Sequence, residues 1–159
     1  MAKPASGTPA IVALEAAGVP FSIHPYELTE SADTYGEAVA AVLGVDPDRL
    51  FKTLIAEVDG HPTVAIVPVS SRLSTRSLAR AAGGKKADMI APDIAERLTG
   101  YVTGGISPFG QKRPLATFVD ETIELWDTVY VSAGKRGLQV EVAPADLILL
   151  LEAGVADLI

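Results

Sequence analysis

The sequence predicts a single domain of the α+β class, and three observations lead to this prediction. Capped segments with the length of helices occur among short apolar runs that are typical of strands, and glycine or proline stands at most boundaries between them. The chain has 159 residues, 48% of them hydrophobic, which is enough to bury one substantial core but leaves no room for a second domain. It has no internal repeat or linker. We expect residues 1–7 to be a flexible lead-in and residues 8–159 to form the domain.

The helices are predicted from signals at their ends. Thr8 and Pro9 supply an N-cap and a first-turn proline, and Gly18 ends the helix that follows. Thr34 and Glu37 have the spacing of a capping box before the second helix. The predicted helices cover residues 10–17, 38–43, 75–82, 91–98 and 147–152, with a brief helical turn after residue 120.

The strands are predicted from alternation and from apolar runs. Segment 19–28 alternates loosely between apolar and polar residues, as a strand with one solvent-exposed face does. Segment 50–58 is apolar on both faces, which is typical of a buried strand, and Asp59-Gly60 turns the chain into 62–69 to form a hairpin. Further strands are predicted at 115–119, 128–132 and 138–142.

Composition excludes several classes of function. The net charge of −7 argues against non-specific binding to nucleic acid, because such affinity comes mainly from cationic side chains. The absence of cysteine excludes disulfides, thiolate metal sites and a cysteine nucleophile, and two histidines are too few for a usual zinc site. We therefore expect no cofactor and no metal. Because no apolar run reaches the ~18 residues that span a bilayer and the first residues lack the apolar region of a secretory signal, we expect a cytoplasmic protein without membrane contact.

Segment 99–113 is too apolar for a solvated loop and too broken for a helix. Gly104 and Gly105 permit backbone angles that are closed to other residues and leave main-chain N–H groups uncovered, while Pro108 fixes the turn that follows. A ligand could approach this backbone closely, so the segment is a candidate binding loop. A tight connection between two strands is the alternative, because glycine and proline mark most connections.

Three further features are candidates for the same site, and each has a plain structural alternative. Lys52 stands near the start of a buried strand, where it either faces a ligand or keeps its ammonium in water above a buried stem. Tyr26 either reaches a cleft from its strand or packs in the core. The glycine-rich connection 132–137 carries two cations in an otherwise acidic protein, and it is a hairpin turn in either case.

Taken together, three motifs resemble the YbaK/EbsC family of Cys-tRNA(Pro) deacylases, which are relatives of the editing domain of bacterial prolyl-tRNA synthetases. The motifs are Phe51-Lys52-Thr53-Leu54, the segment 99–110, and the segment 130–137, and they occur in the family's order and approximate spacing. The resemblance runs from about residue 10 to residue 159. It implies a mixed sheet that curls toward a barrel, with helices packed around it and a cleft lined by these motifs.

The resemblance also implies which residues act. It implies Lys52 and Gly104 as catalytic residues. The substrate-binding residues that it implies are Tyr26, Thr53, Gly105, Ile106, Ser107 and Ser132. Two positions depart from the family pattern: Ala133 replaces a glycine, and Gln139 stands where the family commonly has aspartate, so no carboxylate role can be carried over to that position.

The implied reaction is hydrolysis of the ester that joins a mischarged amino acid to the 3′ adenosine of tRNA, with the substrate's own cysteine sulfur as nucleophile. A protein without cysteine is compatible with this chemistry, because positioning and oxyanion stabilisation can supply much of the rate on an activated ester. The implied partners are the tRNA acceptor end and prolyl-tRNA synthetase.

Three alternatives remain at this stage. The first is a related hydrolase that acts on Ala-tRNA(Pro) or another small aminoacyl ester by water attack. The second is a non-catalytic domain that binds a nucleotide or a partner. A serine hydrolase using Ser107 is disfavoured, because the surrounding residues do not form the Gly-x-Ser-x-Gly elbow and no base is evident.

Overall fold

The computed structural model describes residues 7–28 and 35–159, and it confirms the α+β class. Residues 1–6, which make up most of the predicted lead-in, and Thr34 of the predicted capping box lie outside the described residues. The helices are α1 (Pro9–Ala17), α2 (Tyr35–Leu43), α3 (Thr75–Ala81), α4 (Pro92–Thr99), the 3-10 helix η1 (Glu121–Leu125) and α5 (Pro144–Leu151). The strands are β1 (Ser22–Pro25), β2 (Phe51–Val58), β3 (His61–Pro68), β4 (Ala87–Met89), β5 (Ala116–Asp120), β6 (Val129–Lys135), β7 (Leu138–Val142) and β8 (Gly154–Ala156).

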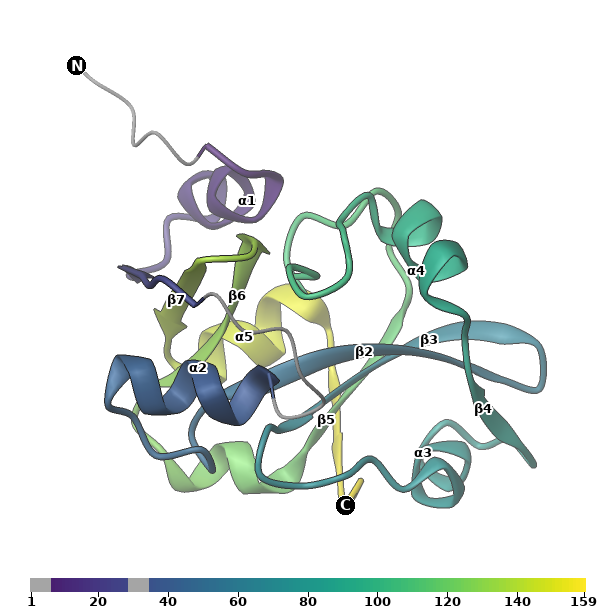
Figure 1. Cartoon of the computed structure of the whole chain (residues 1–159). Coiled ribbons are helices and arrows are strands. Elements are labelled where there is room, and N and C mark those ends of the chain that lie inside the picture. Colours follow the sequence, from purple (N-terminus) through teal and green to yellow (C-terminus); the bar gives the residue numbers. More distant parts are fainter. Residues whose placement is uncertain (1–6, 29–34) are drawn as a thin grey trace.

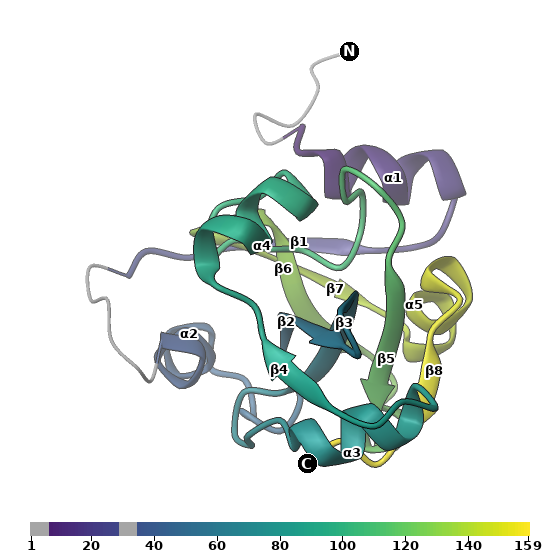
Figure 2. The same ribbon diagram turned by 90° about the vertical axis from the view of Figure 1, so that its right-hand side faces the viewer.

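The strands form two sheets, so the expectation of one mixed sheet that curls toward a barrel holds only loosely. One sheet has the order β1-β7-β6, and the other has the order β4-β2-β3-β5-β8 (Figures 1 and 2). β3 pairs with β5 and β5 with β8 in parallel, while the other pairs are antiparallel. The sheets meet at an isolated parallel bridge between Leu50 and Tyr130, and the described strands do not close into a barrel.

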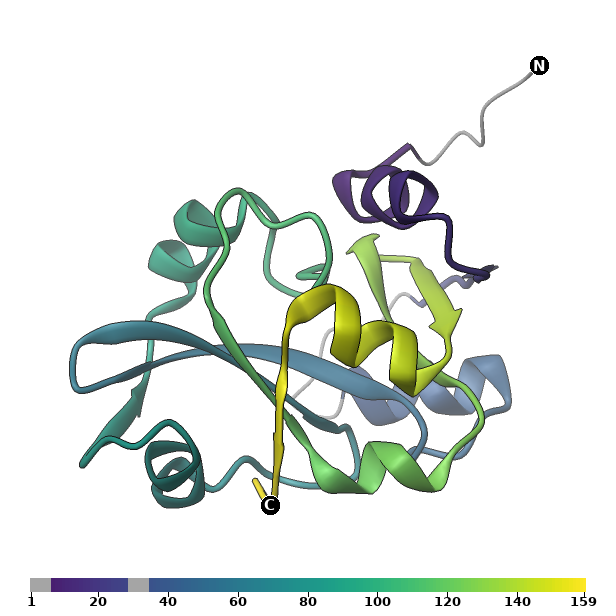
Figure 3. The same ribbon diagram turned by 180° about the vertical axis from the view of Figure 1, so that it is seen from behind.

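Helices cover both sides of this pair of sheets. α2 lies across the front in Figure 1, and α5 lies on the opposite side, which faces the viewer in Figure 3. The main core lies between the sheets and includes fully buried residues of α1, α5 and both sheets, among them Leu14, Phe51, Val131 and Leu147. A second cluster packs beneath α3 and a third beneath α2. This arrangement leaves the space between α2, α4 and the start of β2 for a site.

The capping residues and the glycines at helix ends predicted where these helices begin and end. The Thr8 side chain accepts a hydrogen bond from the Ile11 N–H, and Gly18 ends α1 in the left-handed conformation. Ser74 caps α3 in the same way, and Gly100 ends α4. The strand expected at 19–28 is shorter, covering only Ser22–Pro25, because it pairs with a single neighbour, β7. Strands β4 and β8 were not predicted.

Candidate active site

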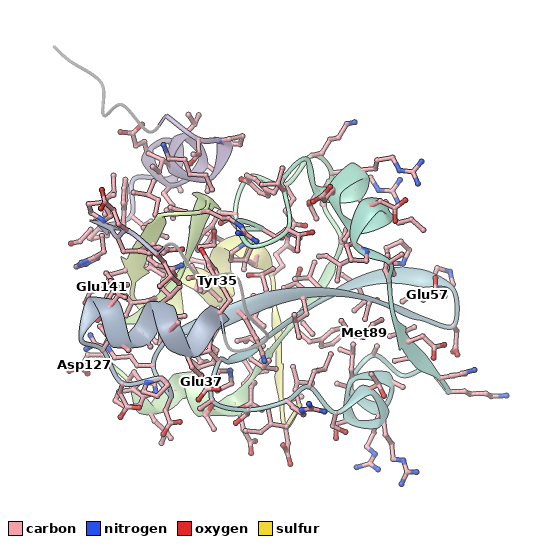
Figure 4. All side chains as sticks on the ribbon, viewed as in Figure 1. Tyr35, Glu37, Glu57, Met89, Asp127 and Glu141 are labelled. Carbon is pink, nitrogen blue, oxygen red and sulfur yellow. The ribbon has the colours of Figure 1, made fainter. Side chains whose placement is uncertain are left out.

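A cavity of about 460 Å³ opens where the two sheets meet, a volume within the range of small-molecule sites. Its walls come from the N-terminal turn of α2, the first half of β2, the end of β4, the loop after α4, and the facing strands β6 and β7. In Figure 4, Tyr35 and Glu37 lie at the N-terminal end of α2 in front of β2, and Met89 lies farther along, by β4. Segments that are distant in sequence thus line one cavity.

The exposed edge of β2 forms the floor of this cavity. β3 pairs with β2 along its whole length on one side, but on the other side β4 pairs only with Ala56–Val58. The Leu50 carbonyl bonds toward β3 (Val69 N–H, 2.8 Å) and the Ile55 carbonyl bonds toward β4 (Ile90 N–H, 3.2 Å). Because successive backbone groups of a strand point to opposite sides, the N–H and C=O of Thr53 point to the free edge. β2 therefore presents main-chain polar groups to a ligand.

Lys52 lines the cavity as a half-buried cation. Desolvation lowers the pKa of its ammonium, the Glu37 carboxylate acts in the opposite direction, and Arg72 lowers the pKa further. The parallel bridge at Leu50 and Tyr130 places Lys52 and Ser132 two residues farther along the two chains, so both enter the same cavity. A cation held partly out of water is suited to bind a phosphate or an oxygen that gains negative charge.

Two loops meet above the cavity at Gly104 and Gly105. Gly105 is buried, and a Cβ built there would lie 2.7 Å from the Lys135 Cα, so only glycine permits this approach of two backbones. Gly104 has φ of +89° and packs beneath Arg136, whose Nε donates to the Thr103 carbonyl at 3.2 Å. The two predicted motifs, 99–113 and 132–137, thus form one structure.

The expectation of uncovered N–H groups holds for one of the two glycines. The Gly105 N–H donates to the Val102 carbonyl at 2.9 Å within the loop. Among the described residues no acceptor takes the N–H of Gly104 or of Ile106. Since both residues line the cavity, their N–H groups are the candidates in this loop to bind a substrate carbonyl.

The structure brings together five of the eight predicted site residues. The cavity is lined by Lys52, Thr53, Gly104, Ile106 and Ser132. Three others lie behind it. Ser107 is fully buried and its Oγ accepts from the Phe109 N–H at 3.2 Å, and Gly105 serves the contact between the loops. Tyr26 is 8% exposed and its hydroxyl bonds the Tyr35 hydroxyl at 2.8 Å, so it supports a residue that lines the cavity.

Sequence reasoning missed three polar residues of the cavity. Tyr35 and Glu37 were read only as parts of a helix start, and Gln139 only as a departure from a pattern. Burial and the hydrogen bond that the Tyr35 hydroxyl shares with Tyr26 raise the pKa of Tyr35 to about 12, so its hydroxyl stays protonated. Gln139 enters the cavity because it pairs with Ser132 across β6 and β7, and two residues directly opposite each other share one face.

Residues 7–28 and 35–159 contain no group of three or more His, Cys, Asp or Glu side chains that could hold a metal ion. Over the same residues, no helix is both long and apolar enough to cross a membrane.

Comparison with known families decides the assignment. The profile of the aminoacyl-tRNA editing domain matches residues 29–150, which is well over half of the chain. The chain belongs to the aminoacyl-tRNA editing domain family. The resemblance drawn from the three motifs is thereby confirmed, and with it the enzyme class, an aminoacyl-tRNA deacylase.

Individual relatives of this editing domain agree with the family assignment. It is 38% identical over 135 residues to EbsC of Enterococcus faecalis, to which Cys-tRNA(Pro)/Cys-tRNA(Cys) deacylase activity is ascribed, and the alignment covers 84% of this chain and 82% of EbsC. It is 32% identical over 101 residues to the proline–tRNA ligase of Maridesulfovibrio salexigens, covering 64% of this chain but 17% of the ligase.

A solved structure described as a trans-editing enzyme for prolyl-tRNA synthetase superimposes on this editing domain with a TM-score of 0.85. The superposition covers 99% of this chain and 98% of the other, at 23% sequence identity. At that identity the likeness shows the fold alone.

Replacing Gly104 of the editing domain by valine is expected to abolish deacylation. A side chain at φ of +89° is strained, and its Cβ would lie 2.4 Å from the Arg136 Nε, so the Arg136 side chain must move aside and the backbone at residue 104 must relax from the conformation that forms the cavity wall. We expect the rate of ester release to fall by roughly 100-fold or more, as when an oxyanion donor is removed. Gly44→Val is the matched control, because Gly44 also has a positive φ but does not line the cavity. Full activity in Gly104→Val would show that the loop is only a connection.

Proposed function

We propose that this protein is a trans-editing hydrolase that clears mischarged Cys-tRNA(Pro). The observation that carries the proposal is that one cavity is lined both by the half-buried Lys52 and by Gly104 and Ile106, whose N–H groups bond to no acceptor among the described residues. Lys52 would hold the terminal phosphate or sugar of the tRNA, and the two N–H groups would orient and polarise the ester carbonyl. The identity to EbsC supports the choice of cysteine as the aminoacyl group.

In the proposed reaction the nucleophile comes from the substrate. The cysteine sulfur attacks the ester carbonyl carbon, the bond to the 3′ oxygen breaks, and the thiol proton passes to the departing 3′ hydroxyl. A small thiolactone leaves and water later opens it to free cysteine. The cavity is consistent with this route, since its described lining contains no histidine, the chain contains no cysteine, and the Ser132 Oγ already accepts from the Gly134 N–H.

The remaining predicted contacts belong to the same proposal. Thr53 and Ser132 would bind the aminoacyl ester directly, and Tyr26 would act through Tyr35. Gly105 and Ser107 would hold the loop in shape from behind. We place residues 8–159 in one deacylase domain, in the cytoplasm, where charged tRNA is made and used.

The partner is proposed to be prolyl-tRNA synthetase. Exposed cations stand at Lys112-Arg113 and Lys135-Arg136, enough to hold the terminal nucleotides of a tRNA, but the net charge of −7 leaves little basic surface for its body. Selectivity for tRNA(Pro) would then come from the synthetase, which would present the mischarged end in a ternary complex. The similarity to a proline–tRNA ligase supports this choice of partner.

The test is deacylation of Cys-tRNA(Pro) and Cys-tRNA(Cys) by the purified protein, with and without the synthetase, at moderate salt. We expect little discrimination by the protein alone and a clear preference for tRNA(Pro) when the synthetase is present. A panel that includes Ala-tRNA(Pro) examines the alternative substrate. If the isolated protein already separates the two cysteinyl tRNAs strongly and the synthetase changes nothing, recognition lies in this chain and the charge argument is wrong. No turnover of any charged tRNA would favour a binding domain.

A further inference from the structure

We propose that Gln139 and Thr53 bind the α-amino group of the aminoacyl ester. The inference rests on the proposed function, because it names the part of that substrate which these two side chains recognise. It assigns the site a preference for esters that carry a free amine next to the carbonyl carbon.

The first observation is that both side chains hold a buried oxygen that has no hydrogen-bond partner. Gln139 is 5% exposed, and no described residue donates to its Oε1. The Oγ1 of Thr53 is equally cut off from solvent and equally unpartnered. Leaving a buried polar group unpaired is costly, and folded proteins satisfy the great majority of such groups. Two of them in residues that line one cavity indicate that a ligand supplies the missing donors.

The second observation is where these oxygens lie. Gln139 and Thr53 both line the cavity that holds Lys52 and the Gly104 loop. The register of the sheet positions Gln139 opposite Ser132, which lines the same cavity. A third unpartnered buried atom among the described residues is the Trp126 Nε1, and Trp126 does not line the cavity. Both residues that hold an unpartnered oxygen, but not Trp126, therefore belong to the active site.

The number and kind of these groups select the ligand. The Gln139 Oε1 and the Thr53 carbonyl only accept hydrogen bonds, and the Thr53 hydroxyl can accept as well. The Thr53 carbonyl also faces the cavity, because it points to the free edge of β2. An ammonium has three N–H donors and no acceptor, whereas a thiol or a hydroxyl has one hydrogen to give. Three acceptors thus match the α-amino group better than they match a substrate side chain.

The charges around the cavity permit this occupant. Lys52 lines the cavity and lies close enough to Arg72 for the two cations to repel each other, and Glu37 is the one carboxylate among the described lining residues. The Glu37 carboxylate is exposed at the rim, where it offsets part of the repulsion between Lys52 and a second cation. Gln139 adds no charge of its own, so it can accept from the amine in either protonation state.

Binding of two non-hydrolysable amides tests the inference without turnover. The first is adenosine that carries cysteine through a 3′-amide, and the second carries 3-mercaptopropionate instead, which differs only by lacking the α-amino group. We expect wild-type protein to bind the cysteinyl amide about 10- to 100-fold more tightly, as judged by calorimetric Kd values, because a buried acceptor is satisfied by one ligand and not by the other.

Gln139→Leu and Thr53→Val each remove one side-chain acceptor with little change in side-chain size, and both leave the Thr53 main-chain carbonyl in place. Each substitution is expected to reduce the preference to a few-fold, because it weakens binding of the cysteinyl amide and leaves the affinity for the mercaptopropionyl amide unchanged. Trp126→Phe is the matched control, because it removes the unpartnered atom that lies outside the cavity and should keep the wild-type preference. The ratio of two affinities within one protein corrects for any loss of folded protein.

Three results would overturn the inference: equal affinity of wild type for the two amides, no measurable binding of either at millimolar concentration, or a preference that survives both substitutions. Deacylation of Cys-tRNA(Pro) is measured in parallel. If the ester is hydrolysed but the amides bind equally, the amino-group site is wrong and the proposed function stands. If the amides are distinguished but no ester is hydrolysed, the site stands and the proposed function is wrong.

Discussion

Lys52→Ala is expected to lower the rate of Cys-tRNA(Pro) deacylation by roughly 100-fold or more, on the scale of losing one preorganised charge-stabilising group. The ammonium is half-buried in the cavity, and water that replaces it cannot supply a fixed positive charge. Lys52→Met keeps most of the stem and removes the charge, so it separates electrostatics from packing. The measurement is single-turnover deacylation together with thermal unfolding of each variant.

The thermal stability of the Lys52 variants should not fall together with their activity. Desolvation lowers the pKa of Lys52, which means that the unfolded chain holds this proton more tightly than the folded protein does. The charged lysine therefore destabilises the fold at pH values below its folded pKa, and that cost disappears as the pH rises through it. Removing the charge at neutral pH should leave the melting temperature unchanged or raise it. Lys86→Ala is the matched control, since Lys86 has a side chain that is 78% exposed and lies outside the cavity.

The pH profile supplies a second test of the same residue. If charged Lys52 is required, activity should decline on the alkaline side at a pH below the ordinary lysine value of 10.5, because its pKa is lowered. The decline should be absent from whatever residual activity Lys52→Met retains. A Lys52→Ala variant that melts like wild type and remains fully active would remove Lys52 from the mechanism.

The sequence alone predicted the features that depend on local chemistry. Thr8, Ser74 and Gly100 mark helix ends because capping is decided within a few residues, and Asp59-Gly60 marks the hairpin for the same reason. The sequence also singled out Lys52 and the loop at Gly104, because lysine in an apolar strand and paired glycines are locally unusual; both line the cavity, and their catalytic roles stay predictions.

The features that depend on distant pairing were not predictable. β4 and β8 are three residues each and exist because β2 and β5 offer them an edge, which no local pattern reveals. Tyr35 and Glu37 line the cavity because α2 lies against β2. Ser107 does not line it, because its side chain is buried within its own loop. Gln139 needed the register of β6 and β7 before its direction could be known.

Cys-tRNA(Pro) should be deacylated about 100-fold or more faster than Ser-tRNA(Pro), although the two aminoacyl groups differ by one atom, because a thiol is a few per cent ionised at neutral pH and intrinsically nucleophilic. A serine hydroxyl would need a base to attack. Glu37 is the one carboxylate that lines the cavity within the described chain, and it is exposed at the rim. Single-turnover rates on the two charged tRNAs, each corrected for spontaneous hydrolysis, measure the ratio.

Glu37→Gln separates the two possible nucleophiles. If the substrate thiol attacks, loss of this carboxylate removes only a neighbour of Lys52, and the rate on Cys-tRNA(Pro) should change by a few-fold at most. If water attacks and Glu37 takes its proton, the same substitution should cost roughly 100- to 10,000-fold, as the loss of a general base does. Equal wild-type rates on the cysteinyl and seryl tRNAs, combined with a large loss in Glu37→Gln, would replace the substrate-assisted route with hydrolysis by an activated water.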